Sequence, residues 1–264
     1  MSTQSINLTP PYMVHSDNLR ALSLIKNRTT KGDRSNYNKL HFDFLIENFG
    51  ENELILPAFN YDFPRTKIFD TRLSVSQSGQ LTQYVLSDKL MGRTETPITS
   101  VLTKIPELLS LEVKEAYGKN SVFDYLYKNN GSVIFYGTDI MTCTYFHYVE
   151  NQYGPPLYRY DKSFSGDVVT EAGKKEAKIT LHVRPQSLQL IYARDLLERT
   201  LNDAGVIVKL SEYHFGVRAH DLSEVLGKVI LKDPFYFLDK ACREDIEGHY
   251  RLLGRRFLLE DFES

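Results

Sequence analysis

The chain has few cysteines, no excess of charge of either sign and no long apolar run. Its 264 residues include two cysteines, Cys143 and Cys242, without a Cys-x-x-Cys pair, so neither a disulfide framework nor a cysteine zinc site is predicted. The 32 basic and 34 acidic residues give a formal net charge of -2, which provides no basic field for nucleic acid. No apolar run approaches the roughly 20 residues of a membrane-spanning helix.

Several targeting and cofactor motifs are also missing. The N-terminal segment has no basic stretch followed by an apolar core, so we expect no secretory signal and a cytoplasmic protein. The sequence contains no Walker loop, no Gly-x-Gly-x-x-Gly after a strand, no Gly-x-Ser-x-Gly elbow and no His-Glu-x-x-His. A glycine-rich phosphate cradle is therefore not predicted, which argues against kinases and dinucleotide-dependent oxidoreductases.

The N-terminal part of the chain alternates between strand and helix patterns. Short apolar runs at 12–14, 53–57 and 132–136 are typical of strands, and apolar residues at helical spacing predict a helix over 35–49. Such alternation favours an α/β fold, and we expect a layered αβα domain with a mixed central sheet.

The pattern of predicted helices and strands changes after a Gly-Pro-Pro break at 154–156. Beyond it the patterns predict a strand at 178–184, an amphipathic helix at 187–202, a strand pair at 206–210 and 213–218, and a helix at 221–231. We expect a C-terminal mixed α+β portion within one domain that spans 1–264, with a possible sub-boundary near 154.

The segment 131–150 is the strongest candidate for chemistry. The strand at 132–136 ends at Gly137, and an aromatic segment with Thr144, His147 and Glu150 follows. If that segment is helical, the three side chains lie one turn apart along one stripe. His147 can act as a general base because its usual pKa is near neutrality, Glu150 can orient it, and the Thr144 hydroxyl can donate to an oxyanion. The competing interpretation is a buried, hydrogen-bonded imidazole beside a solvated Glu150.

Other polar residues carry weaker signals. Cys143 precedes His147 by four residues, so an imidazole-activated thiol is conceivable, although a small core cysteine is favoured. His15 and Ser16 end a strand, where they can bind an anion or cap a helix. Loop residues beyond a strand often hold sugars or amines, and the candidates here are Asn60, Tyr61 and Asp62. The remaining histidines show no metal-ligand pairing with carboxylates, so we assign structural roles to His41, His182, His214, His220 and His249 and predict no metal site.

Taken in order, these segments resemble the aminoglycoside 3-N-acetyltransferase family, the antibiotic N-acetyltransferases. The matching blocks are VHS at 14–16, ELILPAFNYDF at 53–63, FD at 69–70, SGQL at 78–81, RTETPITS at 93–100, NSVFDYLY at 120–127 and the Thr-x-x-His-x-x-Glu block at 144–150. The last block is the most specific, and the chain beyond it matches only loosely.

The resemblance implies an acyl-CoA-dependent N-acyltransferase that moves an acetyl or hydroxyacyl group to a sugar amine by direct attack. It implies His147 as general base, Thr144 as a donor to the tetrahedral intermediate, and Glu150 as the residue that orients the ring or holds the amine. Contacts with coenzyme A are expected from His15, Ser16, Arg93, Ser100 and Ser121. Contacts with the sugar are expected from Asn60, Tyr61, Asp62 and Gln83.

Two departures from the family pattern bear on the substrate. Thr96 precedes Pro97 where the family usually has His-Pro, and Gln83 stands where a glutamate is common. Both changes make the site less suited to a polycation. The leading hypothesis is therefore a nucleotide-linked deoxyamino sugar used for surface polysaccharide such as the lipopolysaccharide O-antigen.

The diphosphate of such a substrate could meet Arg65, Lys67 or Arg72. The alternatives are an aminoglycoside 3-N-acetyltransferase that confers antibiotic resistance and a non-catalytic relative that binds coenzyme A or sugar. The expected partners are these small molecules, with no nucleic acid and no membrane, and a homo-oligomer is left open.

Overall fold

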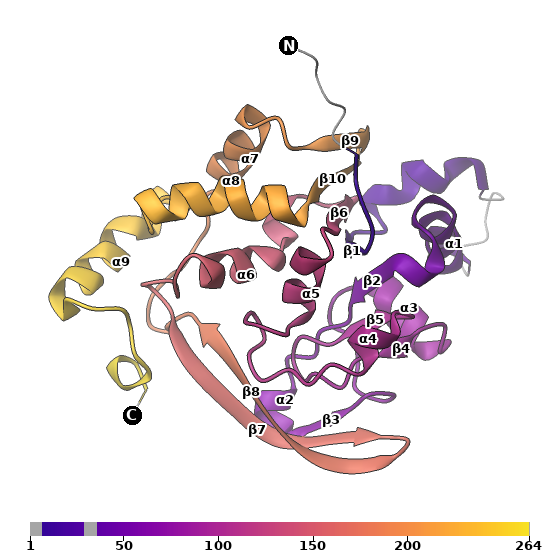
Figure 1. The fold of residues 1–264 in the computed structure, drawn as a ribbon, viewed down its shortest axis with the longest axis horizontal. Helices are drawn as coiled ribbons and strands as arrows, with labels where there is room; N and C mark the ends of the chain where they lie inside the picture. Colours follow the sequence, from indigo (N-terminus) through magenta and orange to yellow (C-terminus); the bar gives the residue numbers. More distant parts are fainter. Residues whose placement is uncertain (1–6, 29–35, 264) are drawn as a thin grey trace.

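A computed structural model describes residues 7–28 and 36–263 of the chain (Figure 1). Its larger sheet has seven strands in the order β4-β5-β2-β1-β6-β10-β9. The bounds are β1 Tyr12–Ser16, β2 Leu54–Pro57, β4 Gly92–Arg93, β5 Val101–Thr103, β6 Ser132–Tyr136, β9 Val208–Ser211 and β10 His214–Arg218. β1 pairs in parallel with both β2 and β6, whereas β5 and β10 add antiparallel strands outside them. The sheet is therefore mixed, as the sequence predicted.

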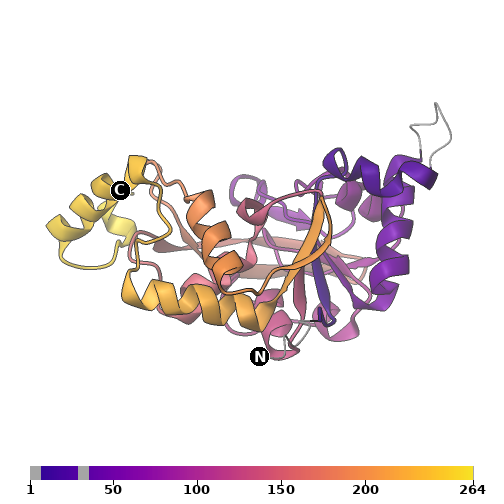
Figure 2. The same cartoon turned by 90° about the horizontal axis from the view of Figure 1, so that it is seen from above.

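Helices cover both faces of this sheet (Figure 2). They are α1 Tyr37–Phe49, α2 Phe63–Thr66, α3 Gln80–Ser87, α4 Pro106–Leu109, α5 Val122–Lys128, α6 Tyr145–Gln152, α7 Arg194–Asp203, α8 Ala219–Lys232 and α9 Lys240–Leu253. Short 3-10 helices occupy Arg20–Arg28, Glu51–Glu53, Ile140–Thr142 and Leu259–Asp261. The layered αβα arrangement predicted from the sequence is confirmed.

Adjacent residues of the central strands face opposite layers. Met13 belongs to the apolar cluster formed with α5, α6 and α8, while Val14 belongs to the cluster formed with α1 and α3. Because side chains alternate along a strand, a strand buried on both faces needs an unbroken apolar run. Every residue of β6 is buried, as is every residue of β2.

A second sheet, with the order β3-β7-β8, lies beside the first and is formed mainly by a long hairpin. Its strands are β3 Ile68–Asp70, β7 Tyr160–Thr170 and β8 Gly173–Val183, and Figure 1 shows the hairpin running along one edge of the molecule. Gly166 permits close packing there, because a Cβ at this position would lie 2.3 Å from the backbone oxygen of Lys67. The hairpin brings His182 of β8 toward α6.

Two expectations about elements need correction, and two long elements were not predicted. Residues 187–193 are not helical, and α7 begins only at Arg194. Leu188 and Leu190 are both buried in the cluster that contains α9, and this spacing of two suits an extended segment rather than a helix. The sequence also predicted only the second half of β8 and did not predict β7 or α9.

Two other expectations concern regions at the limits of the described structure. Ser35, where the first helix was predicted to begin, and residues 1–6 of the N-terminal segment lie outside the described residues. Within the described residues, none of the helices combines the length and the apolar character needed to cross a bilayer.

Candidate active site

The stripe of polar residues on α6 lies just beyond the carboxyl end of β6. After Tyr136, Gly137 turns the chain with φ +69, and a Cβ there would lie 2.3 Å from the backbone oxygen of Asp17. The Asp139 side chain then accepts a hydrogen bond from the Met141 N–H over 2.9 Å and caps the short 3-10 helix that leads into α6. This sequence of turn and caps places Thr144 at the N-cap of α6, with His147 and Glu150 inside the helix.

His147 and Glu150 are in direct contact. His147 Nδ1 lies 2.8 Å from Glu150 Oε2, one helical turn away. Glu150 is 1% exposed, so the interpretation of Glu150 as a solvated surface charge is wrong. The His147 side chain is 22% exposed and can be reached from solvent. A buried carboxylate therefore holds one nitrogen of a reachable imidazole.

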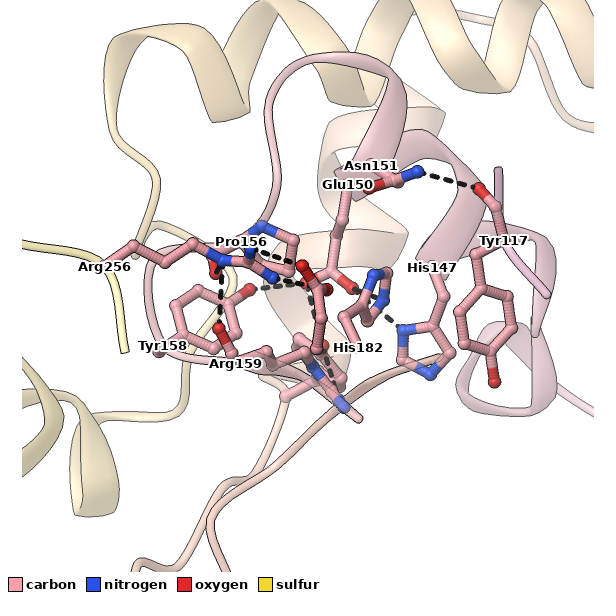
Figure 3. Close-up of polar contacts among 11 residues, drawn as sticks. Tyr117, His147, Glu150, Asn151, Pro156, Tyr158, Arg159, His182 and Arg256 are labelled. Atoms are coloured by element: carbon pink, nitrogen blue, oxygen red, sulfur yellow. Dashed lines mark hydrogen bonds and ion pairs between the residues drawn. The ribbon is translucent and has the colours of Figure 1, made fainter. Parts of the chain in front are cut away.

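The other carboxylate oxygen of Glu150 is bound by two tyrosines, of which Figure 3 labels Tyr158. The hydroxyl groups donate to Oε1 over 2.5 Å from Tyr158 and 2.8 Å from Tyr192. The Arg159 guanidinium in turn donates to the Tyr192 hydroxyl over 3.0 Å and is itself 8% exposed. Glu150 is thus held by donors on both oxygens, which a buried carboxylate requires.

The protonation states at the pair follow from these contacts. Burial acts to raise the pKa of Glu150, but the hydrogen bond with His147 and the charge of Arg159 outweigh it and lower the pKa to about 2. Burial, assisted by Arg159, lowers the pKa of His147, and Glu150 opposes this only in part. Near neutral pH, Glu150 is therefore ionised and His147 neutral, so Nδ1–H donates to the carboxylate and Nε2 keeps its lone pair.

His182 lies on the other side of Glu150. Its Nε2 is 3.9 Å from Glu150 Oε2 and has no hydrogen-bond partner among the described residues. The sequence-based statement that no carboxylate accompanies this histidine is therefore wrong. Burial lowers the pKa of His182 to about 3. The Tyr117 ring packs against both histidines, 4.9 Å from the His182 ring and 5.0 Å from the His147 ring.

The same three residues could in principle hold a metal ion. Ligand atoms of His147, Glu150 and His182 all lie within 4.8 Å of one another, and two imidazoles with a carboxylate are a common donor set for zinc. The cationic Arg159 close to Glu150 opposes a divalent cation there, because like charges repel. The absence of a metal stays a prediction.

The residues predicted to contact coenzyme A differ in accessibility. Ser16 is half-buried at the end of β1, and the buried His15 beside it has an unpartnered Nε2 within the described structure. Arg93 and Ser100 bond one another over 3.0 Å, and both bind the backbone oxygen of Ala58. The Ser121 hydroxyl accepts from the Asp124 N–H and caps α5. These bonds hold Arg93, Ser100 and Ser121 in the fold, and their contact with coenzyme A stays a prediction.

The predicted sugar-binding residues lie on a loop whose contacts are mostly internal. Asn60 is buried, and its Nδ2 donates to the backbone oxygen of Val75. Asp62 pairs with Arg65 at 3.0 Å, and Gln83 accepts from the Ser76 N–H. Tyr61 is 59% exposed.

A role for the four loop residues in sugar binding stays a prediction.

Sequence analysis missed most of the residues that surround Glu150. Tyr117, Tyr158, Arg159, His182 and Tyr192 come from separate segments that tertiary packing brings together. Tyr158 and Arg159 follow the Gly-Pro-Pro break after one intervening residue, and that break was the one sequence signal near them.

The fold is a mixed α/β sheet, and its candidate site pairs a buried carboxylate with a reachable imidazole. The aminoglycoside 3-N-acetyltransferase family model matches residues 56–218. The chain belongs to this family, and it is an acyl-CoA-dependent N-acetyltransferase. No curated protein sequence matches the chain.

Several solved structures share the fold. One is AAC-IIIb in a binary complex with CoASH, with a TM-score of 0.65 and 16% identity over 86% of this chain and 92% of that chain. Another is the apoenzyme of AAC(3)-IVa, with a TM-score of 0.65 and 15% identity over 93% of this chain and 92% of that chain. A third is the YokD protein from Bacillus subtilis, with a TM-score of 0.64 and 13% identity over 84% of this chain and 87% of that chain.

Proposed function

We propose that this enzyme transfers an acetyl group from acetyl-CoA to an amine of an amino sugar, with His147 as the general base. The observation that carries the proposal is the contact between His147 Nδ1 and the ionised Glu150 over 2.8 Å. It fixes the tautomer whose Nε2 accepts a proton, and the partial exposure of His147 lets a substrate reach it.

The reaction at this site is a direct transfer. Nε2 of His147 takes a proton from the sugar nitrogen as that nitrogen attacks the thioester carbonyl, and the new C–N bond forms. The C–S bond then breaks, and the imidazolium returns its proton to the departing thiolate. Thr144, one turn before His147 at the N-cap of α6, is the donor that we assign to the oxyanion.

Ion pairs on the loop favour an aminoglycoside over a nucleotide-linked sugar. Arg65 pairs with Asp62 at 3.0 Å, and Arg72 binds both carboxylate oxygens of Asp70. The charge of these two cations is therefore partly neutralised, and a diphosphate would have to share each of them with a carboxylate. In addition, a solved AAC(3)-IVa variant with this fold is a complex with apramycin.

A nucleotide-linked amino sugar remains the second candidate because of two substitutions in the sequence. Gln83 and Thr96 remove a carboxylate and an imidazole that the family pattern carries, and carboxylates favour polycationic drugs. Under either candidate we place the enzyme in the cytoplasm, where acetyl-CoA is available. We also propose that residues 1–264 form one domain.

One experiment separates these functions. Release of free thiol from acetyl-CoA is followed colorimetrically with a panel of aminoglycosides and with dTDP-linked amino sugars. Turnover with aminoglycosides supports the first candidate, and turnover with dTDP sugars alone supports the second. If neither set gives thiol while CoA still binds in calorimetry, the protein is a non-catalytic binder and the proposal is wrong.

A further inference from the structure

A small apolar cavity lies beside His147. Its walls are formed by the residues before and within α6 and by leucines of α7 and α8, and they include Met141, Cys143, Phe146, His147, Leu197 and Leu226. Its volume is about 40 Å³. Nothing in the mechanism described above accounts for this cavity, although it adjoins the proposed base.

The chemistry of the walls restricts what the cavity can hold. Apart from His147, the described lining residues offer no charged group. Burial raises the pKa of the Cys143 thiol to about 12, so that thiol stays neutral. The Tyr192 ring also lines the cavity, but its hydroxyl is engaged by Glu150 and Arg159. An ammonium group, a phosphate or the amides of a pantetheine arm would lose their hydrogen bonds here, at a cost in free energy. The occupant must be apolar and uncharged.

The size of the cavity restricts the occupant further. A cavity needs roughly 10–15 Å³ to hold one water-sized group, so this cavity has room for about three such groups. That is the scale of a methyl to propyl group. Because His147 must lie close to the thioester carbonyl during attack, the alkyl part of the acyl group is the apolar moiety nearest to this cavity.

We propose that this cavity is the acyl pocket and that it selects short, unsubstituted acyl groups from acetyl to butyryl. The proposal rests on the proposed function, since His147 places the thioester at the mouth of the cavity. It deepens that function by naming the acyl donors. It also argues against the hydroxyacyl groups considered from the sequence. Among the described lining residues, Nε2 of His147 is the side-chain acceptor with a free lone pair, and the attacking amine uses it, so a hydroxyl in this cavity would lack a partner.

The test measures kcat/KM for a series of acyl-CoA donors with one accepted amine. Acetyl-, propionyl- and butyryl-CoA should lie within about tenfold of one another, and hexanoyl-CoA should fall at least about a hundredfold below acetyl-CoA. 3-Hydroxybutyryl-CoA should be at least about tenfold poorer than butyryl-CoA. Equal rates for hexanoyl- and acetyl-CoA, or for the hydroxylated and plain butyryl donors, would overturn the proposal.

Two variants tie the selectivity to this cavity. Met141→Ala, at a position 37% exposed and safe for folding, should raise the hexanoyl-to-acetyl ratio at least about threefold. Leu197→Phe should lower the butyryl-to-acetyl ratio of kcat/KM about tenfold. Leu252→Ala, at an 86% exposed position on α9, is the control and should change neither ratio. If Leu197→Phe fails to fold, Met141→Ala decides alone, and an unchanged ratio there overturns the proposal. Loss of all thiol release in the unmodified enzyme would instead contradict the proposed function itself.

Discussion

The Tyr158 hydroxyl donates to Oε1 of Glu150 over 2.5 Å, so a residue beyond the Gly-Pro-Pro break supports the carboxylate that orients the His147 imidazole. The phenol draws negative charge away from the carboxylate. Glu150 therefore stays ionised, but it raises the pKa of His147 less than a carboxylate without this hydrogen bond would. The geometry links the C-terminal part of the chain to the basicity of His147.

Tyr158→Phe tests this link. Without the phenol, Glu150 stabilises the imidazolium more strongly, so the pKa of His147 rises and the acid limb of the kcat/KM profile moves to higher pH. Loss of one hydrogen bond of roughly 1–1.5 kcal/mol predicts that the acid limb moves by up to about one pH unit. Tyr160→Phe is the matched control, because that hydroxyl also donates to a carboxylate, on Glu263, away from the site. A profile for Tyr158→Phe that coincides with that of the control would show that the phenol does not act on His147.

Glu150→Gln removes the charge but keeps the shape of the side chain. The amide cannot stabilise an imidazolium, and it can hold the ring in the wrong tautomer by donating to Nδ1. We expect kcat to fall about a hundredfold or more, while the KM for acetyl-CoA changes by less than about threefold. Steady-state kinetics measures both values. Glu224→Gln is the comparison, because Glu224 is an exposed helical carboxylate paired with Lys228. Retention of more than a third of the kcat would remove the carboxylate from the proposed chemistry.

The Cys143 thiol provides a test of direct transfer. Cys143 is buried, and burial raises its pKa to about 12, so it is a poor nucleophile near neutral pH. Cys143→Ala should therefore keep the rate with acetyl-CoA within about threefold. Thiol-release assays and intact-mass spectra of enzyme mixed with acetyl-CoA both report on this step. A covalent intermediate would be indicated if the unmodified enzyme became acetylated and Cys143→Ala lost both the acetylation and the activity.

Buried histidines should make the fold sensitive to acid. Burial lowers the pKa from 6.5 to about 4 for His15, His41 and His214, and to about 3 for His182. Below pH 6.5 the unfolded chain binds protons that the folded chain does not, so the free energy of unfolding decreases as the pH falls from 6.5 toward 4. Each such histidine contributes up to about 1.4 kcal/mol per pH unit in this window.

Urea unfolding at several pH values measures this dependence. His214→Leu should make the slope shallower by about one histidine's share. A slope in His214→Leu equal to that of the unmodified protein would contradict the assignment of a neutral, buried ring.

The sequence allowed prediction of the features that depend on local pattern. Unbroken apolar runs identified β2 and β6, and the spacing of three residues placed His147 and Glu150 on one face of α6. Local pattern could not identify β7, because only Tyr160 and Val168 of this strand are buried and its sequence has no long apolar run. The same limitation made residues 187–193 resemble a helix, although packing against α9 holds Leu188 and Leu190 in an extended segment.

The surroundings of Glu150 could not be predicted for a different reason. Tyr158, Tyr192 and His182 are brought to one carboxylate by the hairpin and by the segment before α7, and no spacing in the sequence records that convergence. Tyrosine is common in this chain, with 17 copies, so its presence near the break carried no signal. Only tertiary structure distinguishes the two phenols that bind Glu150 from the rest.

The most direct test of the account is the pH dependence of thiol release by His147→Ala and His147→Gln with acetyl-CoA and an accepted amine. We predict that both variants lose at least about a hundredfold in kcat and lose the acid limb seen in the unmodified enzyme, while CoA binding measured by calorimetry persists. Near-unmodified turnover in either variant, with the acid limb still present, would contradict the claim that the imidazole at position 147 takes the proton from the attacking amine.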